Sequence, residues 1–141
     1  MKIIVAGIYL YPMYQEALAS GLESINQDAH RVVLLNGHSW DQCVAYKNSK
    51  IVKQAVDDIK PDCLFLYRVE IIFAGVLRYL KHKYPQMKIF IYHNDDPFRK
   101  TLHRRLKSFH YLRCVKYADI TYVYRPVNIE EAKQWGAKEA K

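Results

Sequence analysis

The stretch "KIFIYHNDDPF" (residues 88–98) decides the fold class, because it joins an apolar run to a tight group of polar side chains. The run 88–92 is short and rich in β-branched and aromatic residues, as in a strand buried on both faces of a parallel sheet. A histidine, an asparagine and two aspartates follow at once, at 93–96, and Pro97 ends the run. The sequence therefore predicts a strand whose carboxyl end carries an imidazole, an amide and two carboxylates.

Similar apolar runs recur along the chain and alternate with patterns of helical period. The expected strands are 2–8, 30–36, 62–68, 88–93 and 119–125, and the expected helices are 13–25, 48–60, 73–84, 101–117 and 128–136. Asn128 is a plausible N-cap of the last helix and Gly136 its stop. Strands and helices that alternate in this way form right-handed βαβ crossovers. We therefore expect an α/β fold: a doubly wound, mainly parallel, Rossmann-like sheet with helices on both faces, in one domain spanning residues 1–141.

Composition narrows the class of protein. The 141 residues are enough for one core without disulfides, and the three cysteines form no close pair, which favours a reducing compartment. The start, "MKIIVAGIYLYPMY", is too short to span a bilayer and lacks a signal-peptide cleavage site. We expect a cytoplasmic protein, with a peripheral position on the inner face of the cell membrane left open.

The net charge of +8 is concentrated in one segment. Residues 99–116 carry seven Lys or Arg and no acid, which leaves 15 basic against 14 acidic residues elsewhere. The helix expected there has an apolar stripe, which should pack on the sheet while the cations face outward; the stripe consists of Leu102, Leu106, Phe109, Leu112 and Val115. An anionic membrane surface or a phosphorylated lipid carrier is favoured over nucleic acid, because no nucleic-acid reader motif is present. The residues assigned to this membrane or anion contact are Arg99, Lys100, Arg104, Arg105 and Lys107.

The residues that follow each strand are the candidates for ligand binding, since ligands of such sheets lie outside the carboxyl ends of the strands. The first turn, "GIYLYPMY", lacks the glycines of a dinucleotide cradle, and no Walker A sequence occurs, so we expect no nucleotide or flavin cofactor. Its tyrosines could stack on a sugar or simply cover the edge of the sheet. Arg68 could hold a phosphate or carboxylate, or pair locally with Glu70. The residues assigned to substrate binding are Tyr9, Tyr11, Arg68, Asn94 and Arg125.

The "HNDDP" loop (93–97) carries the candidate catalytic residues His93, Asp95 and Asp96. The imidazole can donate to a sugar hydroxyl or a phosphate, and a carboxylate can act as a base. The aspartates could instead cap the following helix. They could also hold a divalent cation, but no further carboxylate cluster supports this, so we expect no metal site.

Several motifs, taken in order, resemble those of a known family. They are "KIIVAGI" (2–8), "IKPDCLFLYR" (59–68), "IFIYHNDDPF" (89–98), "YADITYVYR" (117–125) and "EEAKQWGAK" (130–138). Across nearly its whole length the chain resembles the N-terminal Rossmann-like half of GT-B glycosyltransferases, and is most similar to the spore-maturation CgeB-like group and relatives that act on surface polysaccharides.

The resemblance implies transfer of a sugar from a nucleotide-sugar donor to a glycan or lipid-linked acceptor, with no bound metal. The N-terminal half would mainly shape the acceptor site, and the C-terminal half would grip the donor. His93 matches a family histidine that reaches the donor across the cleft, and Asp95 or Asp96 would contact the acceptor or act as base. The family would continue beyond "GAKEAK" into a second domain, so this chain is expected to be inactive alone.

The chain departs from several of these relatives in its first turn, which is not rich in glycine. The alternative interpretation is a stand-alone flavodoxin-like or receiver-like module that binds or regulates without catalysis. A receiver would want acids after the first strand, and none is present there. A flavin binder would purify as a yellow protein.

Overall fold

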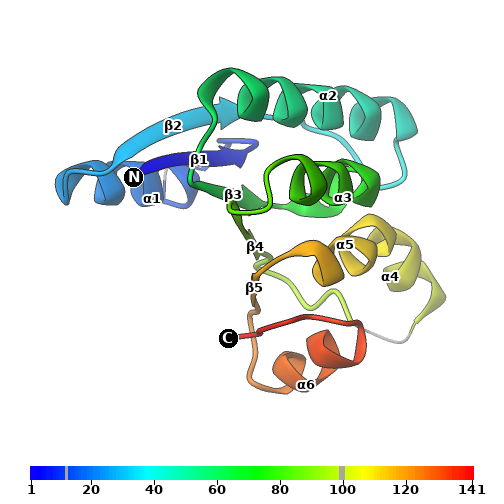
Figure 1. Cartoon of the computed structure of the whole chain (residues 1–141). Coiled ribbons are helices and arrows are strands. Elements are labelled where there is room, and N and C mark those ends of the chain that lie inside the picture. Colours follow the sequence, from blue (N-terminus) through cyan, green and yellow to red (C-terminus); the bar gives the residue numbers. More distant parts are fainter. Residues whose placement is uncertain (12, 99–100) are drawn as a thin grey trace.

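The computed structural model describes residues 1–11, 13–98 and 101–141, and shows one parallel sheet covered by helices on both faces (Figure 1). The strands are β1 (Lys2–Gly7), β2 (Asp28–Val33), β3 (Cys63–Tyr67), β4 (Lys88–Tyr92) and β5 (Ile120–Tyr122). All four neighbouring pairs run parallel, in the order β2-β1-β3-β4-β5. The predicted α/β class with a parallel, Rossmann-like sheet is confirmed.

The helices divide unequally between the two faces of the sheet. They are α1 (Gln15–Ser24), α2 (Gln42–Ile59), α3 (Ala74–Lys83), α4 (Leu102–Lys107), α5 (Phe109–Cys114) and α6 (Val127–Gln134), with 3-10 turns η1 (Val69–Ile71) and η2 (Val115–Tyr117). Figure 1 shows α1 on one side of the sheet, and α2, α3 and α5 on the other. The larger hydrophobic core lies under α2, α3, α5 and α6, and the smaller one lies under α1.

The period-two alternation of strand side chains explains these two cores. In β1, Ile4 faces the larger core, while Ile3 and Val5 face Ala19 of α1. The three β1 side chains are almost completely buried. A strand apolar at every position therefore belongs in the middle of a sheet with covers on both faces.

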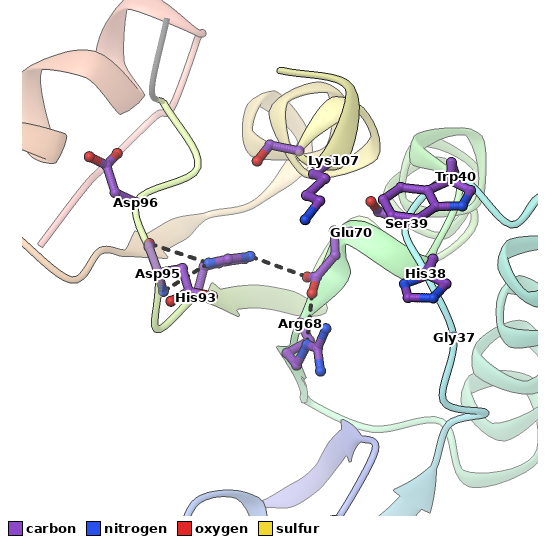
Figure 2. Close-up of a pocket in the computed structure, with 11 residues that line it drawn as sticks. Gly37, His38, Ser39, Trp40, Arg68, Glu70, His93, Asp95, Asp96 and Lys107 are labelled. Atoms are coloured by element: carbon purple, nitrogen blue, oxygen red, sulfur yellow. Dashed lines mark hydrogen bonds and ion pairs between the residues drawn. The ribbon is translucent and has the colours of Figure 1, made fainter. Parts of the chain in front are cut away.

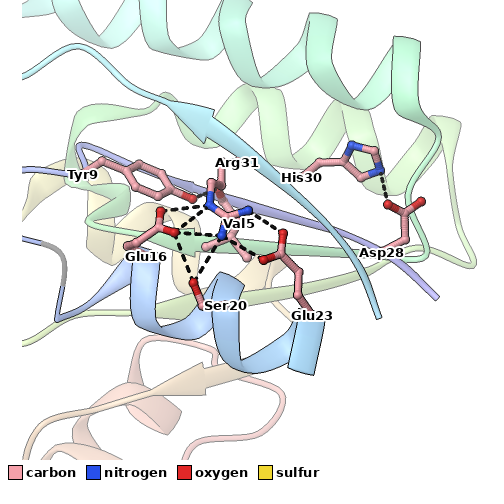
Figure 3. Close-up of polar contacts among 8 residues, drawn as sticks. All are labelled: Val5, Tyr9, Glu16, Ser20, Glu23, Asp28, His30 and Arg31. Atoms are coloured by element: carbon pink, nitrogen blue, oxygen red, sulfur yellow. Dashed lines mark hydrogen bonds and ion pairs between the residues drawn. The ribbon is translucent and has the colours of Figure 1, made fainter. Parts of the chain in front are cut away.

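Helix α1 is also tied to the edge strand β2 by an ion-pair network. The Arg31 guanidinium lies between Glu16 and Glu23, and its Nε donates to Glu16 Oε2 at 2.8 Å (Figure 3). Because these side chains are largely exposed, the network orients α1 on the edge strand more than it stabilises the fold.

Helix α2 begins six residues earlier than its hydrophobic pattern predicts. Asp41 is its N-cap, and the side chain accepts a hydrogen bond from the Val44 backbone N–H at 3.1 Å. The helix ends at Ile59, and its C-cap Lys60 adopts a left-handed conformation with φ of 52° just before Pro61.

The helix expected over 101–117 is wrong in two respects. It is split into α4, α5 and η2, with a non-helical break at Ser108. Leu102, Leu106 and Phe109 do not pack on the sheet: they are 76%, 59% and 47% exposed. Of the stripe, only Leu112 in α5 and Val115 in η2 are buried. Amphipathic periodicity therefore indicated the position of the helix but not which of its turns are covered by the sheet.

Asn128 is not the N-cap of the last helix, as expected, but lies inside α6 and is fully buried. Its side-chain amide donates to Asp96 Oδ1 at 3.0 Å and to Glu131 Oε2 at 2.7 Å. Asn128 therefore joins α6 to the loop after β4. Gly136, the expected stop, follows the helix with φ of 91°.

The strand order creates a crevice at one edge of the sheet. The chain leaves β1 for β2 on one side and then crosses to β3 on the other side of β1. The connections that follow β1 and β3 therefore diverge at their carboxyl ends, and such a switch point is where doubly wound sheets bind ligands.

Candidate functional site

Two adjoining cavities lie at the carboxyl edge of the sheet. The larger, here called the His93 cavity, has a volume of about 230 Å³ (Figure 2). The smaller, here called the Gln15 cavity, has a volume of about 150 Å³. Arg68 and Asp95 line both cavities, so the two form one continuous site.

The His93 cavity is built around a buried pair of side chains from adjacent strands. His93 follows β4 and Glu70 follows β3, and the two are 7% and 6% exposed. The imidazole Nε2 lies 3.4 Å from Glu70 Oε2. Its Nδ1 lies 3.3 Å from the Asp95 backbone carbonyl oxygen, so in the imidazolium form Nδ1–H donates to this carbonyl while Nε2–H faces Glu70. The edge of the Tyr111 ring packs against the imidazole, with 4.9 Å between the ring centroids.

The electrostatics of this pair favour its charged form. Burial alone would raise the pKa of Glu70, but His93 and Arg68 lower it to about 2. Burial alone would lower the pKa of His93, but the Glu70 carboxylate, with a smaller contribution from Asp95, holds it above its usual value. The pair therefore places an imidazolium beside a carboxylate at the cavity wall.

Arg68 reaches the same carboxylate from the other side. Its Nε donates to Glu70 Oε1 at 2.7 Å, so the local pairing that the sequence left open is formed. The backbone of Arg68 is left-handed, with φ of 65°, and its side chain is 36% exposed. A non-glycine residue in this conformation is strained, and such strain is typical of functional sites. The terminal guanidinium nitrogens make no hydrogen bond within the described part of the chain, which leaves them available to a ligand.

The two aspartates of the loop have different environments. Asp95 is exposed at the mouth of both cavities. Asp96 accepts hydrogen bonds from the Phe98 backbone N–H at 3.2 Å and from Asn128, and lies 3.7 Å from Arg125 Nη1. Asp96 also lines the His93 cavity, but its contacts anchor the loop to α6, so Asp95 is the more exposed of the two carboxylates at the cavity.

The residues assigned to substrate binding are only partly brought together. Tyr11, Asn94 and Arg68 line the Gln15 cavity. Tyr9 lines neither cavity: its hydroxyl donates to the Val5 carbonyl at 2.7 Å, on the side of the sheet that α1 covers (Figure 3). Arg125 lines neither cavity, and its Nη1 lies 3.7 Å from the Asp96 carboxylate.

The residues assigned to a membrane or anion contact are also divided. Arg99 and Lys100 lie outside the described residues, as does the side chain of Arg104. Arg105 is exposed on α4. Lys107 lines the His93 cavity, and its Nζ lies 5.7 Å from the centre of the Trp40 ring. Of the described cations, Lys107 therefore lies at the cavity and Arg105 on the outer surface.

The sequence assigns no role at the His93 cavity to three of the residues that form it. It indicates Glu70 as a partner of Arg68 but not of His93. His38 and Trp40, in the loop after β2, stack with ring centroids 4.5 Å apart and close the cavity opposite His93 (Figure 2). The signal was their position after a strand, but only the strand order shows which strand ends are neighbours.

The described residues, 1–11, 13–98 and 101–141, contain neither a cluster of metal ligands nor a membrane-spanning helix. No group of three or more His, Cys, Asp or Glu side chains in this part of the chain is arranged to hold a metal ion. None of its helices has both the length and the apolar character needed to cross a membrane.

In comparisons with known proteins, the chain matches no family model and no curated protein. Its function must therefore be inferred from the chemistry of the two cavities and from the sequence motifs. That chemistry combines a buried imidazolium–carboxylate pair, a half-exposed guanidinium and an exposed carboxylate at the carboxyl edge of a parallel sheet.

Proposed function

We propose that this domain is the acceptor-side half of a glycosyltransferase, which moves a sugar from a nucleotide-sugar donor to a glycan or lipid-linked acceptor. One observation carries the proposal: His93 is held on Glu70 and stands beside the exposed Asp95, at the edge of the sheet where ligands bind. The resemblance of the "HNDDP" loop to that of GT-B enzymes supports the same assignment.

Each residue has a role in this proposal. The His93 imidazolium and the Arg68 guanidinium supply positive charge toward the phosphates of the donor, where negative charge grows as the nucleotide leaves. Asp95 takes the proton of the acceptor hydroxyl while that oxygen bonds to the anomeric carbon. Glu70 touches no substrate and positions His93.

The test is a transfer assay in which this domain is combined with a C-terminal nucleotide-sugar-binding domain. The domain alone is expected to bind nucleotide sugars weakly or not at all and to transfer nothing. The two-domain enzyme should transfer sugar, and His93→Ala should reduce kcat by about a hundredfold or more. Wild-type transfer by His93→Ala would refute the assignment of the site.

The proposal includes an anionic membrane as the surface on which the domain rests. Trp40 is 52% exposed and lies beside the exposed apolar side chains of α4 and α5, and together they line a groove of about 450 Å³. Lys107 Nζ lies 5.7 Å from the centre of the Trp40 ring, and the exposed Arg105 precedes Leu106 in α4. Apolar side chains bordered by cations are typical of proteins that bind at the interface of anionic membranes. Trp40 and Ser39 line both the groove and the His93 cavity, so a docked membrane would bring lipid-linked acceptors to the cavity.

The strand order favours a second candidate function. The order β2-β1-β3-β4-β5 is that of flavodoxin-like sheets, which bind a flavin at the β1/β3 switch point. A stand-alone flavin-binding module would purify yellow or would quench the fluorescence of added flavin mononucleotide in proportion to its concentration. Colourless protein without quenching would exclude this candidate.

A further inference from the structure

The Gln15 cavity lies at the switch point of the sheet and is distinct in chemistry from the His93 cavity. Its walls come from three segments: Tyr14 and Gln15 follow β1, Tyr67 ends β3, and Asn94 follows β4. The crevice between the ends of β1 and β3 is the position at which doubly wound sheets most often bind ligands.

Two buried polar atoms on residues that line this cavity have no partner. Gln15 is 4% exposed and Tyr67 is 5% exposed. Neither Gln15 Oε1 nor the Tyr67 hydroxyl has a hydrogen-bond partner among the described residues. A buried polar group without a partner costs stability, so two of them on one cavity indicate a ligand or water that completes their hydrogen bonds.

The position of the Gln15 amide is built into the fold. A Cβ atom placed on Gly7 would lie 2.6 Å from Gln15 Nε2 and 2.7 Å from its Cγ. Glycine at the end of β1 therefore makes the space in which the Gln15 side chain lies. The Gln15 amide that lines the cavity is therefore held in place by the fold and is not a mobile surface side chain.

Tyrosine rings form one wall of the cavity. The Tyr14 ring stacks on Tyr67 with 5.3 Å between centroids, Tyr67 stacks on Tyr92 at 5.2 Å, and Tyr11 meets Tyr14 edge-on at 6.3 Å. Burial raises the pKa of Tyr67, so its hydroxyl stays neutral. An aromatic wall with neutral hydrogen-bonding groups matches a ligand that has an apolar face and a polar edge.

The size of the cavity limits this ligand. A volume of about 150 Å³ equals that of roughly five water molecules. The cavity is open on one side, so it takes in part of a single ring such as that of a hexose, and the rest of the ring stays outside.

We propose that the Gln15 cavity binds a neutral sugar ring, with Gln15 Oε1 accepting from one hydroxyl of the sugar and the Tyr67 hydroxyl bonding to another. The inference rests on the proposed function in naming a sugar as the ligand class. It assigns the acceptor sugar to this cavity and leaves the charged groups of the substrates to the His93 cavity. Arg68, on the wall shared by the two, contacts both.

The experiment is saturation-transfer NMR on the whole chain, with glucose, galactose and N-acetylglucosamine as probes and cyclohexanol as a ring without multiple hydroxyls. At least one sugar should bind and cyclohexanol should not. Tyr67→Phe and Gln15→Met should each weaken that sugar about three- to tenfold, the effect of one neutral hydrogen bond. Both variants should keep or raise Tm, because each removes a buried polar atom that has no partner.

The matched control is Tyr92→Phe, which changes the same ladder of tyrosines but lies outside the lining of the cavity, and it should leave sugar binding unchanged. Equal weakening by Tyr92→Phe and Tyr67→Phe would overturn the proposal, as would the absence of binding by all three sugars. Loss of Tm in Tyr67→Phe with unchanged sugar binding would show that the hydroxyl serves the fold alone.

The inference and the proposed function can fail separately. If sugars bind here but the two-domain enzyme transfers none, the sugar-binding proposal is supported and the proposed transferase function is refuted. If transfer proceeds and Tyr67→Phe leaves the KM for the acceptor unchanged, the transferase function is supported and the sugar-binding proposal is refuted.

Discussion

The His93 imidazole lies 3.4 Å from the Glu70 carboxylate, and the two side chains come from the ends of adjacent strands. Each is buried, and each makes the charged form of the other more stable.

Glu70→Gln should lower the pKa of His93. Burial of the imidazole favours its neutral form, and the carboxylate of Glu70 is the main group that opposes burial. Without that carboxylate the pKa should fall below the usual histidine value. An NMR titration of the imidazole resonances measures it directly. Asp95→Asn, which removes a lesser contribution, should cause a smaller fall, and an unchanged pKa in Glu70→Gln would contradict the pairing.

The same pair should make stability depend on pH in two windows. The folded pKa of His93 is raised above 6.5, so its contribution is complete below that value and is lost as the pH rises through the folded pKa. The pKa of Glu70 is lowered from 4.5 to about 2, so its contribution is complete above 4.5 and is lost as the pH falls toward 2. In urea unfolding, the difference between wild type and Glu70→Gln should be larger near about pH 5.5 than near about pH 9. A difference that grows with pH would show the opposite linkage.

Arg68→Gly should be more stable than Arg68→Ala by about 1 kcal/mol, because a left-handed backbone is strained for any residue with a Cβ. Both variants lose the guanidinium, so the comparison isolates the backbone. At Lys50, an exposed residue inside α2, the same pair of substitutions should have the opposite order. Chemical denaturation of the four variants is the measurement, and equal stability of the two Arg68 variants would argue against strain.

Gly7→Ala should destabilise the fold and displace the Gln15 amide, because the new methyl group would overlap its Nε2 and Cγ. Shortening the partner, in the double variant Gly7→Ala with Gln15→Ser, should restore much of the lost Tm. Gly21→Ala is the control: no atom lies within 4 Å of the new methyl group, and alanine favours the helix, so this variant should gain stability. If the double variant loses as much Tm as Gly7→Ala, the destabilisation does not come from overlap with the Gln15 side chain.

The exposed apolar residues of α4 and α5 should bind anionic vesicles. Replacing Leu106 and Phe109 together by serine should lower partitioning onto phosphatidylglycerol vesicles by about tenfold or more in a sedimentation assay. Lys107→Gln should lower it by about fivefold, and only at low salt. Ile25→Ser, at an equally exposed apolar residue beyond α1, is the matched control and should have no effect. Equal binding to neutral and anionic vesicles would contradict the proposal, and a change from dimer to monomer in the serine variant without vesicle binding would assign this surface to a second copy of the chain.

Sequence reasoning predicted the sheet because β1, β3 and β4 are compact apolar runs, but it placed β2 two residues late, because that strand begins at Asp28 and carries the polar His30 and Arg31. It misjudged α2, whose first turns are polar and are specified by the cap at Asp41 rather than by periodicity. It misplaced Leu102 and Leu106 in the core, since periodicity shows that a helix has an apolar side and not what covers that side. The link from His93 to Glu70 requires β3 and β4 to be neighbours, which the sequence does not state.

The position of Arg68 on the wall between the cavities has a thermodynamic consequence. A ligand that engages the guanidinium from one side fixes a group that the other side also uses. The two binding equilibria are therefore linked, and each ligand must change the affinity of the other by the same factor. In a domain that holds an acceptor sugar in one cavity, the affinity for that sugar would thus depend, through a single side chain, on whether an anion is bound in the other.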